Sequence, residues 1–498
     1  MRIAFVHCLY ENLGIEYLSS YLKREGHEVS LFFDPILFDN YLIKSRLLDR
    51  TFNFKEHLVD AIVKDKPDVV AFSVLSDNYS WCCSMAKEIK KRLRATIVFG
   101  GVHPTAVPHH VIKNDFVDFV VCGEGEEAMG RLMSHLSQGK DVSTIRNLCY
   151  KNGSSSVLNE LSPPLSDLNL VPFPDKDLFF NEYKDFVTEA YMIITARGCI
   201  YRCSYCCENL MNKLYGRYHR RRSPDNVIEE LVWAKKKYGI HRVNFQDSVF
   251  TYNRPWLEEF LPQYKEKIAL PFFCFIYPSG VVDEKLVGQL TDAGCVSMNM
   301  GVQSINPQLR KQVFLRNESN EEITRIIRII KKTSLYLYLD FVLFPLQRES
   351  ELRETMRFCS RMSADFVTIS WLRYYPGTEI IDISKELGIL NDEDIQSINE
   401  GRDFTPYFKK KNFPIKTYSK MANLIAGSGW LPPFLMNVII KFKLYYLVTS
   451  KSLFLPIITI TGSIKQLFRG KTPYYKSIWA YFGKYYYVYM KRKLMHKA

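Results

Sequence analysis

Three cysteines stand close together in the segment RGCIYRCSYCCEN. Cys199, Cys203 and Cys206 are spaced C-x3-C-x2-C, and a fourth thiol, Cys207, follows directly. Structural zinc sites usually pair two such clusters. The sequence has no second cluster, and His219 alone would make a poor zinc ribbon. Three thiolates instead suit a 4Fe–4S cluster in which one iron has no protein ligand. That open iron could bind and activate a cofactor.

The same motif carries a family resemblance. An aromatic residue, Tyr205, precedes its last cysteine, as in the signature of the radical S-adenosylmethionine (SAM) superfamily. In that superfamily the open iron chelates SAM, and an electron from the cluster cleaves the sulfonium to give a 5′-deoxyadenosyl radical. Cys207 lies outside the motif, and we interpret it as a buried thiol or a neighbour of the ligands.

Three later segments, NFQDSVF, GVQS and YYPGT, resemble the strand ends that contact SAM in this superfamily. The family often has a doubled acid in the first of them, where this chain has Gln-Asp. The resemblance implies SAM contacts from five residues, which are Tyr205, Asp247, Gln303, Ser304 and Pro376. The YYPGT segment taken alone is equally typical of an ordinary Pro-Gly turn.

Two glycine-containing turns in the first part of the chain, GGVHPTAVP and CGEGEEA, each follow an apolar segment. Gly-Gly allows close approach of a ligand to the backbone, and a turn that opens a helix presents amide groups to a polar ligand. With FSVLSDNYSW, and ahead of the cysteine motif, these turns resemble the cobalamin-binding domain of cobalamin-dependent radical SAM enzymes. The resemblance implies cobalamin contacts from Ser73, Ser76, Gly100, Gly101, His103, Pro104, Gly123, Glu124 and Gly125.

The sequence predicts no cobalt ligand. Cobalamin-dependent mutases and methionine synthases carry D-x-H-x-x-G, whose His ligates cobalt, whereas the first loop here is VHCLYENLG. We therefore expect His7 and His103 to have structural or hydrogen-bonding roles. The alternative is that this domain has lost cobalamin and is only structural.

Four regions would position these residues, and together they predict an α/β protein. Residues 1–140 alternate short apolar strands with helices, which predicts a Rossmann-like parallel sheet that binds ligands beyond its strand ends. Residues 141–185 contain a hairpin with an Asn-Gly turn and a Pro-rich linker. Residues 186–385 give six strand–helix units, which predict a partial (β/α)6 TIM-like barrel with its chemistry at the strand ends. Residues 386–498 form a basic, aromatic and mostly helical C-terminal region.

The resemblance implies a reaction as well as a fold. Enzymes of this class commonly use SAM and cobalamin to methylate an unactivated carbon or a phosphinate phosphorus. The alternative within the class is cyclisation or rearrangement without net methylation. An iron–sulfur electron carrier would leave the barrel and the SAM-contact segments unexplained. We expect a small-molecule or lipid substrate and a reductant such as flavodoxin or ferredoxin.

Length, composition and the first residues indicate the class of protein and its cellular compartment. The chain has 498 residues, of which 47% are hydrophobic and 24% charged, as in folded proteins of two or three domains. Its first residues, MRIAFVHCLYENLG, resemble a first strand rather than a signal peptide. We therefore expect a cytoplasmic protein with reduced thiols.

The excess positive charge lies entirely in residues 404–498, which contain 17 Lys and Arg, 21 aromatic residues and no Asp or Glu. Lysine with tyrosine and tryptophan is typical of a membrane interface, so we expect peripheral attachment to the inner face of a membrane. The 20-residue uncharged window 421–440 contains two glycines and two prolines and is not expected to span a membrane. The alternative is a solvated basic face over an aromatic core. Nucleic-acid binding has no supporting motif.

Overall fold

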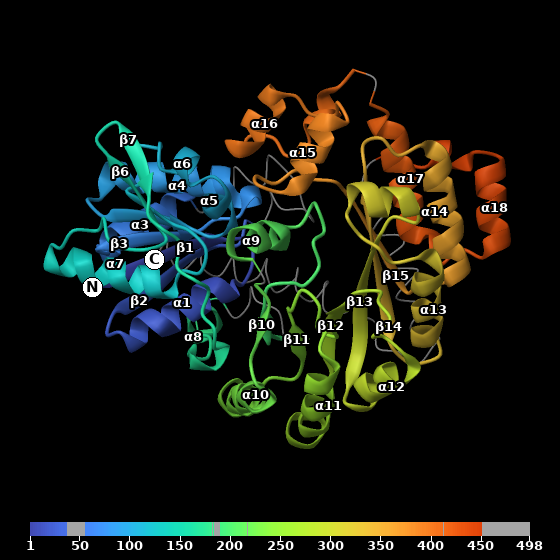
Figure 1. The fold of residues 1–498 in the computed structure, drawn as a ribbon, viewed down its shortest axis with the longest axis horizontal. Helices are drawn as coiled ribbons and strands as arrows, with labels where there is room; N and C mark the ends of the chain where they lie inside the picture. Colours follow the sequence, from blue (N-terminus) through green and yellow to red (C-terminus); the bar gives the residue numbers. More distant parts are fainter. Residues whose placement is uncertain (37–54, 182, 184–189, 217, 412, 451–498) are drawn as a thin grey trace, which may run out of the picture.

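The computed structural model describes residues 1–36, 55–181, 183, 190–216, 218–411 and 413–450. These residues form an N-terminal α/β unit, an open barrel and a helical C-terminal region, with the barrel in the middle (Figure 1).

The N-terminal unit is built on a seven-stranded sheet in the order β2-β1-β3-β4-β5-β6-β7. The first five strands pair in parallel, and the last two pair antiparallel at one edge. The strands are β1 (Arg2–Cys8), β2 (Glu28–Asp34), β3 (Val69–Ser73), β4 (Thr96–Gly100), β5 (Phe119–Val121), β6 (Leu148–Asn152) and β7 (Ser155–Leu158).

Alternate residues of these strands contribute to two separate hydrophobic cores, because successive side chains of a strand point to opposite faces of the sheet. On β1, Ile3 and Phe5 enter the core under α1 and α7, whereas Val6 and Cys8 enter the core under α3 and α4. The helices are α1 (Leu13–Arg24), α3 (Lys55–Asp65), α4 (Tyr79–Arg92), α5 (Val102–Ala106), α6 (Pro108–Val111) and α7 (Glu126–Gln138). This confirms the predicted doubly wound parallel sheet.

Six parallel strands form the barrel sheet in the order β15-β14-β13-β12-β11-β8, as predicted. They are β8 (Tyr191–Ile193), β11 (Val243–Phe245), β12 (Phe272–Ile276), β13 (Cys295–Gln303), β14 (Tyr336–Leu343) and β15 (Phe366–Trp371). The outer helices are α10 (Pro224–Tyr238), α11 (Arg254–Gln263), α12 (Glu284–Asp292), α13 (Asn320–Lys331) and α14 (Glu349–Met362).

Side chains at helix starts explain several boundaries of the barrel helices. Ser223 accepts a hydrogen bond from the Asn226 amide at 3.3 Å, and Pro224 occupies the first position of α10. Asp283 caps α12 in the same way, through the Leu286 amide at 2.7 Å. Each cap satisfies a backbone donor that would otherwise have no partner within the helix.

The two faces of the barrel sheet differ in character. Met298 and Met300 of β13 are fully buried against the outer helices, whereas Ser297 and Asn299, which alternate with them, lie on the other face. That second face lines the inside of the open barrel. Its strand ends carry the loops that hold the cysteine motif and the SAM-contact segments.

Contacts cross two of the predicted regional boundaries. The hairpin predicted within the 141–185 linker is present, but β6 and β7 extend the N-terminal sheet and belong to that unit. The C-terminal region does not stand apart from the barrel, because α17 (Ile415–Ser428) packs on β15 and α14 and contributes to the barrel core. Sequence reasoning missed both points because pairing and packing across the chain leave no local pattern.

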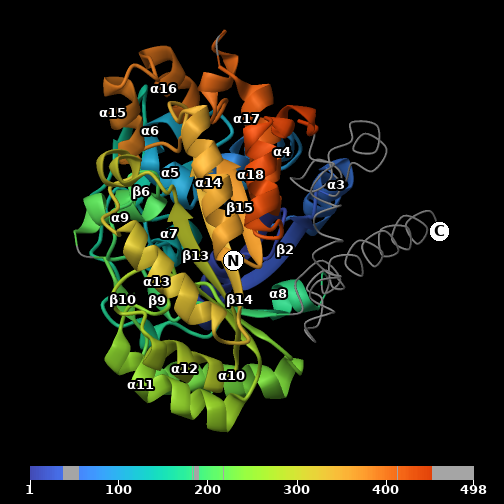
Figure 2. The same ribbon diagram turned by 90° about the vertical axis from the view of Figure 1, so that its right-hand side faces the viewer.

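The C-terminal region also contains α15 (Glu379–Glu386), α16 (Asp392–Asn399), α18 (Pro433–Lys441) and the short turn η7 (Leu444–Leu447). The predicted break in the window 421–440 is present, because α17 ends at Ser428 and α18 begins at Pro433. Figure 2 shows α17 and α18 in front of the barrel, beside α14. Among the described residues, we find no helix that combines the length and the apolar character needed to cross a membrane. The tail sequence beyond residue 450 lies outside the described residues.

Candidate active site

The cysteine motif occupies one loop at the mouth of the barrel. This loop lies between β9 (Ala196–Arg197) and α9 (Cys207–Tyr215), and Cys206 is the residue that caps α9. It leaves β9 through Gly198, whose φ is +86° and whose added Cβ would lie 2.6 Å from the Tyr218 ring. Only glycine fits that position, so the turn into the cysteine loop is fixed by Gly198 and Tyr218.

The thiols of the loop are partly buried and close enough to influence one another. Burial raises the pKa of Cys199 to about 12, and the neighbouring Cys203 and Cys206 contribute to the rise. The pKa of Cys206 is raised first by a hydrogen bond with Cys207 and then by burial. A metal that displaced these protons would remove the cost of holding the thiolates.

The donor set fits an iron–sulfur cluster. Among the described residues, no three His, Cys, Asp or Glu side chains are already arranged as a metal site. However, three thiols share one loop, and a guanidinium lies beside one of them: Arg316 Nη1 donates to Cys203 Sγ at 3.7 Å. Thiolates and donors to their sulfur atoms are the groups that hold and tune such clusters.

Arg316 joins the cysteine loop to the barrel strands. Its side chain is 4% exposed and donates to the Tyr205 hydroxyl at 3.4 Å, the Gly301 carbonyl at 2.7 Å and Glu318 Oε1 at 2.6 Å. Glu318 therefore balances the buried charge, and Tyr205 is tied to the same group as Cys203. Sequence reasoning missed Arg316, because no motif marks the segment that carries it.

Two tyrosines extend this arrangement over the loop. Tyr277 donates to Glu318 Oε2 at 2.6 Å, and its ring lies under the Arg316 guanidinium at 4.3 Å. Tyr201, from the cysteine loop, stacks on Tyr277 with ring centroids 3.5 Å apart. A stack of two aromatic rings therefore covers one side of the guanidinium that contacts Cys203.

Asp247 makes several contacts within the protein, and its contact with SAM remains a prediction. Its carboxylate is 1% exposed and accepts from the amides of Thr195 at 2.6 Å and Ala196 at 2.9 Å. It also accepts from the Thr195 hydroxyl and pairs with Arg221 at 3.4 Å. These bonds hold the connection from β8 to β9, and they give both oxygens of the carboxylate hydrogen-bond donors within the protein.

A different carboxylate faces the loop from α9. Glu208 accepts a hydrogen bond from the Ser248 hydroxyl at 3.0 Å, and its Oε2 is buried without a partner among the described residues. Burial raises the pKa of Glu208. Ser248 follows Asp247 directly in the NFQDSVF segment, so Glu208 lies beside that predicted SAM-contact segment. The CCEN sequence gave no sign of it.

Gln303 and Ser304, two further predicted SAM contacts, have different surroundings in the protein. Gln303 has a φ of +64° at a register shift of β13, and a Cβ on Gly301 would lie 2.4 Å from its Nε2, so its amide folds over the inner face of the sheet. Ser304 is 2% exposed, and its hydroxyl accepts from the Asn306 amide at 3.1 Å and from Gln347 at 3.4 Å. Ser304 therefore stabilises the loop, while Gln303 remains available to a ligand.

The YYPGT segment, with Pro376 buried, links the barrel to the N-terminal unit. A Cβ on Gly377 would touch Leu210 of α9 at 3.0 Å and Ala106 of α5 at 3.5 Å. On the same loop, Tyr375 donates to Asp77 Oδ2 at 3.2 Å. The strand-end loops of the two units therefore meet around α9, as the central position of α5 and α9 in Figure 1 also shows.

The first glycine turn has a structural reason for its glycines. Gly101 has a φ of +104°, and an added Cβ would lie 2.7 Å from the Val74 carbonyl. The close chain crossing alone therefore requires glycine at this position, and the contact of Gly101 with cobalamin remains a prediction. Gly100 has ordinary space around it, with the nearest contact at 3.6 Å.

Two buried histidines of the N-terminal unit keep unpaired ring nitrogens among the described residues. His103 Nδ1 hydrogen-bonds with the Ser76 hydroxyl at 2.9 Å, and the ring packs on Tyr79 at 4.3 Å, but Nε2 has no partner. His7 Nδ1 is also without a partner. Burial lowers the pKa of each to about 4, so both are neutral near pH 7. These polar atoms at the strand ends fit a ligand with polar side groups, such as cobalamin.

The second glycine turn lies at the contact between the N-terminal unit and the barrel. Glu124 accepts from Arg220 at 2.7 Å and from the Leu165 amide at 2.9 Å, and it pairs with Arg197 at 3.3 Å. A Cβ on Gly123 would overlap Tyr215 of α9. Gly125 packs on α1. The side chain of Glu124 therefore joins the domains, and its contact with cobalamin remains a prediction.

Ser73 and Pro104, the remaining predicted cobalamin contacts, lie at the same strand ends. Ser73 ends β3, and its hydroxyl accepts from Asn12 at 3.3 Å. Pro104 is buried in α5. Their contact with a cofactor remains a prediction.

Comparison with known proteins agrees with this geometry. Residues 193–359 match the radical SAM superfamily, and residues 3–133 match the B12-binding domain. The chain is a radical SAM enzyme with a B12-binding domain. This confirms the two cofactor domains predicted from the cysteine motif and the glycine turns.

Relatives of this radical SAM enzyme include more than one activity. It is 27% identical over 86% of its length to an uncharacterized methyltransferase of Pyrococcus horikoshii, 89% of which is covered. It is 24% identical over 78% of its length to the anaerobic magnesium-protoporphyrin IX monomethyl ester cyclase of Rubrivivax gelatinosus, 70% of which is covered. Its fold is similar to that of the radical SAM methyltransferase TsrM of Kitasatospora setae, solved with cobalamin and a 4Fe–4S cluster bound. That match has a TM-score of 0.64 and 19% identity, and it covers 78% of this chain and 79% of TsrM.

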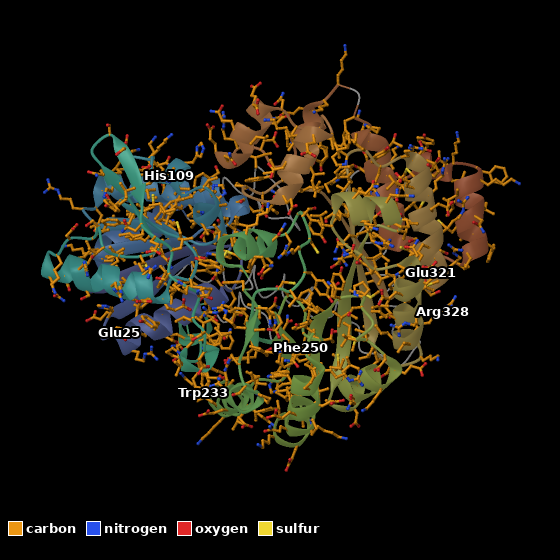
Figure 3. The ribbon with its side chains drawn as sticks, viewed as in Figure 1. Glu25, His109, Trp233, Phe250, Glu321 and Arg328 are labelled. Carbon is orange, nitrogen blue, oxygen red and sulfur yellow. The ribbon has the colours of Figure 1, made fainter. Side chains whose placement is uncertain are left out.

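A hollow elsewhere on the surface is separate from this site. Residues between α12 and α13 line a cavity of about 890 Å³, and they include Glu321 and Arg328. Figure 3 shows both on the outer helices, away from the cysteine loop. The hollow is lined mainly by charged and polar side chains, and it lacks the thiols and strand-end loops that mark the active site.

Proposed function

We propose that this radical SAM enzyme transfers a methyl group from cobalamin to an unactivated carbon of its substrate. One observation carries the proposal: the cysteine loop and the strand ends of the B12-binding domain meet around α9, where a Cβ on Gly377 would lie 3.0 Å from Leu210 and 3.5 Å from Ala106. A substrate held there would lie between the two cofactors. The relative from Pyrococcus horikoshii, which covers most of the chain length and is named a methyltransferase, supports methyl transfer.

Cys199, Cys203 and Cys206 would hold the cluster, and Arg316 would donate to its sulfur environment. The buried, unpaired oxygen of Glu208 would accept from the SAM ammonium group, with Ser248 holding the carboxylate in place. Glu208 thus takes the role that the sequence assigned to Asp247. Gln303 would contact the SAM ribose or carboxylate from the inner face of the sheet.

When bound, these groups supply reductive cleavage of SAM at the cluster and a methyl group at cobalamin. The chain itself orients and shields. Tyr201 and Tyr277 cover the guanidinium side of the cysteine loop, and the Pro376 loop closes the gap to α5. Exclusion of water and stray hydrogen donors protects a radical step.

The test is an anaerobic assay of reconstituted enzyme with SAM, cobalamin and a chemical reductant. Formation of 5′-deoxyadenosine together with S-adenosylhomocysteine is expected, because one SAM is cleaved and another donates its methyl group. 5′-Deoxyadenosine without S-adenosylhomocysteine would favour cyclisation, as in the cyclase relative. Absence of both products would refute the proposal.

The substrate class and the setting follow from the rest of the chain. We infer a small-molecule or lipid substrate, a flavodoxin or ferredoxin as reductant, and a cytoplasmic enzyme attached to the inner face of a membrane. The acid-free sequence from 404 to 498 supports that attachment.

A further inference from the structure

Exposed apolar side chains gather on one small part of the C-terminal region. Fifteen large hydrophobic side chains are exposed among the described residues, and seven of them lie between positions 434 and 447. We call this surface the α18 face. Its members are Phe434, Leu435, Val438, Phe442, Leu444, Tyr446 and Leu447. Three of them are more than half exposed: Phe434 at 70%, Phe442 at 64% and Leu447 at 83%.

The α18 face is not an ordinary solvent face of an amphipathic helix. Met436 and Ile440, spaced four residues apart, are 0% and 5% exposed and join the barrel core beside α14. The opposite side of such a helix usually carries polar residues, whereas here Phe434 and Val438 point outward. Exposed apolar patches of this kind mark interaction surfaces.

The charged residues of the segment that carries the α18 face, residues 433–450, have one sign. Lys441 and Lys443 flank Phe442, and the Lys441 ammonium lies 5.6 Å from its ring centre. Lys420 reaches the Tyr446 carbonyl at 2.6 Å. Amphipathic lysines beside exposed aromatic and aliphatic side chains suit a boundary between water and an apolar phase.

Acidic groups from the neighbouring helix do not offset these lysines. Glu349 of α14 accepts from the Tyr445 and Tyr446 hydroxyls at 2.5 and 3.2 Å and pairs with Arg353 at 3.4 Å. Glu354 pairs with Arg357. Each carboxylate is therefore matched by an arginine of α14 itself.

The charge pattern also identifies the occupant. Residues 451–498 contain ten Lys and Arg and no Asp or Glu, so this segment would bring like charge to the lysines of the face. An anionic surface attracts both. We propose that the α18 face is the membrane-docking surface of this enzyme, with Phe434, Phe442 and Leu447 entering the interface of an anionic lipid bilayer. Lys441 and Lys443 bind its headgroups.

This proposal specifies the membrane attachment inferred above and is independent of the methyl-transfer chemistry. The α18 face lies on the opposite side of the barrel from the B12-binding domain, so docking leaves the meeting point of the two cofactor domains uncovered (Figures 1 and 2). Loss of membrane binding would leave SAM cleavage intact, and loss of SAM cleavage would leave membrane binding intact. The two proposals can therefore fail separately.

The test is co-sedimentation of the full-length, cluster-reconstituted enzyme with vesicles. One set contains phosphatidylcholine with phosphatidylglycerol, and the other contains phosphatidylcholine alone. We expect binding to the anionic set at low salt and weaker binding at high salt. The variant Phe434→Ser/Phe442→Ser/Leu447→Ser should bind at least about tenfold more weakly, because three apolar side chains no longer enter the interface.

Removal of charge should act independently. The variant Lys441→Gln/Lys443→Gln should lose about thirty-fold in affinity for anionic vesicles at low salt, or about fivefold per lysine. Matched controls change equally exposed residues elsewhere. These controls are Leu170→Ser/Leu387→Ser for apolar side chains and Lys285→Gln/Lys332→Gln for charge. Both controls should bind as the wild type does.

Circular dichroism and 5′-deoxyadenosine formation confirm that each variant is folded. The proposal is overturned if the wild type stays in the supernatant with anionic vesicles. It is also overturned if the α18-face variants bind like the wild type, since binding would then reside elsewhere in the chain. A wild-type dimer that the Phe434/Phe442/Leu447 variant dissociates, without lipid binding, would assign the face to self-association instead.

Discussion

Arg316 offers the sharpest test of how the barrel tunes its cysteine loop. Arg316→Gln removes the donor to Cys203 Sγ and leaves Glu318, 1% exposed, without its cation. Removing one partner of a buried ion pair costs about 3–5 kcal/mol of folding free energy. Arg316→Gln/Glu318→Gln should cost less than the single variant, because no buried charge remains unpaired.

The effect on the cluster should have a definite sign. A guanidinium and its N–H favour the more negative, reduced cluster over the oxidised one. Losing a hydrogen bond to a charged group costs about 1.5–3 kcal/mol, and about 1.4 kcal/mol of difference between the redox states corresponds to about 60 mV for one electron. Arg316→Gln should therefore lower the reduction potential by about 60 mV.

The assay is a redox titration of reconstituted protein followed by electron paramagnetic resonance, paired with denaturant unfolding. Arg222→Gln is the control, because Arg222 forms an equally buried pair with Glu230 at 2.5 Å but makes no contact with a cysteine of the loop. It should lower stability without moving the potential. An unchanged or raised potential in Arg316→Gln would show that Arg316 holds the loop but does not tune the cluster.

Three further predictions address the other parts of the site. Cys203→Ala should abolish the visible iron–sulfur absorbance and SAM cleavage, whereas Cys207→Ala should retain both; iron analysis showing the reverse would contradict the ligand set. Gly101→Ala should lower stability by about 1–3 kcal/mol and the bound cobalt with it, whereas Gly139→Ala, with positive φ but open space, should leave cobalt unchanged by elemental analysis. Burial tends to raise the pKa of Glu124, but the hydrogen bonds and charges of Arg220 and Arg197 outweigh this effect, so the pKa is lowered. Its ion pairs therefore stabilise the fold above the ordinary carboxylate pKa, and Glu124→Gln should lower the melting temperature at pH 7 but progressively less as the pH falls below about 4.5.

Features that depend on residues close together in the chain could be predicted from the sequence. Alternating strands and helices predicted both parallel sheets, and the spacing of Cys199, Cys203 and Cys206 predicted the radical SAM domain. The N-terminal glycine turns predicted the B12-binding domain. Each of these signals depends on residues that are neighbours in the chain, so periodicity and motif spacing were sufficient.

Side-chain roles set by distant contacts could not be predicted in this way. Asp247 lies in the expected segment, but its carboxylate binds the amides of Thr195 and Ala196, which are about fifty positions away in sequence. Arg316 is 113 residues from Cys203 and belongs to no motif. Family resemblance identified the two domains correctly, whereas only the packing determines which polar groups of each segment are already bonded within the protein.

Glu124 shows why such a motif can be retained for a reason other than ligand contact. Its carboxylate and that of Glu126 bind Arg197, which immediately precedes the turn into the cysteine loop. Arg220 also pairs with Glu124 and lies opposite Arg197 on the paired strand. The glycine turn of the B12-binding domain therefore fixes the base of the loop that carries the cluster cysteines. Because these ion pairs are largely buried, loss of one arginine would leave a carboxylate uncompensated. Methyl transfer requires the two cofactors at a set separation, and these carboxylates are the groups that connect the two domains at that point.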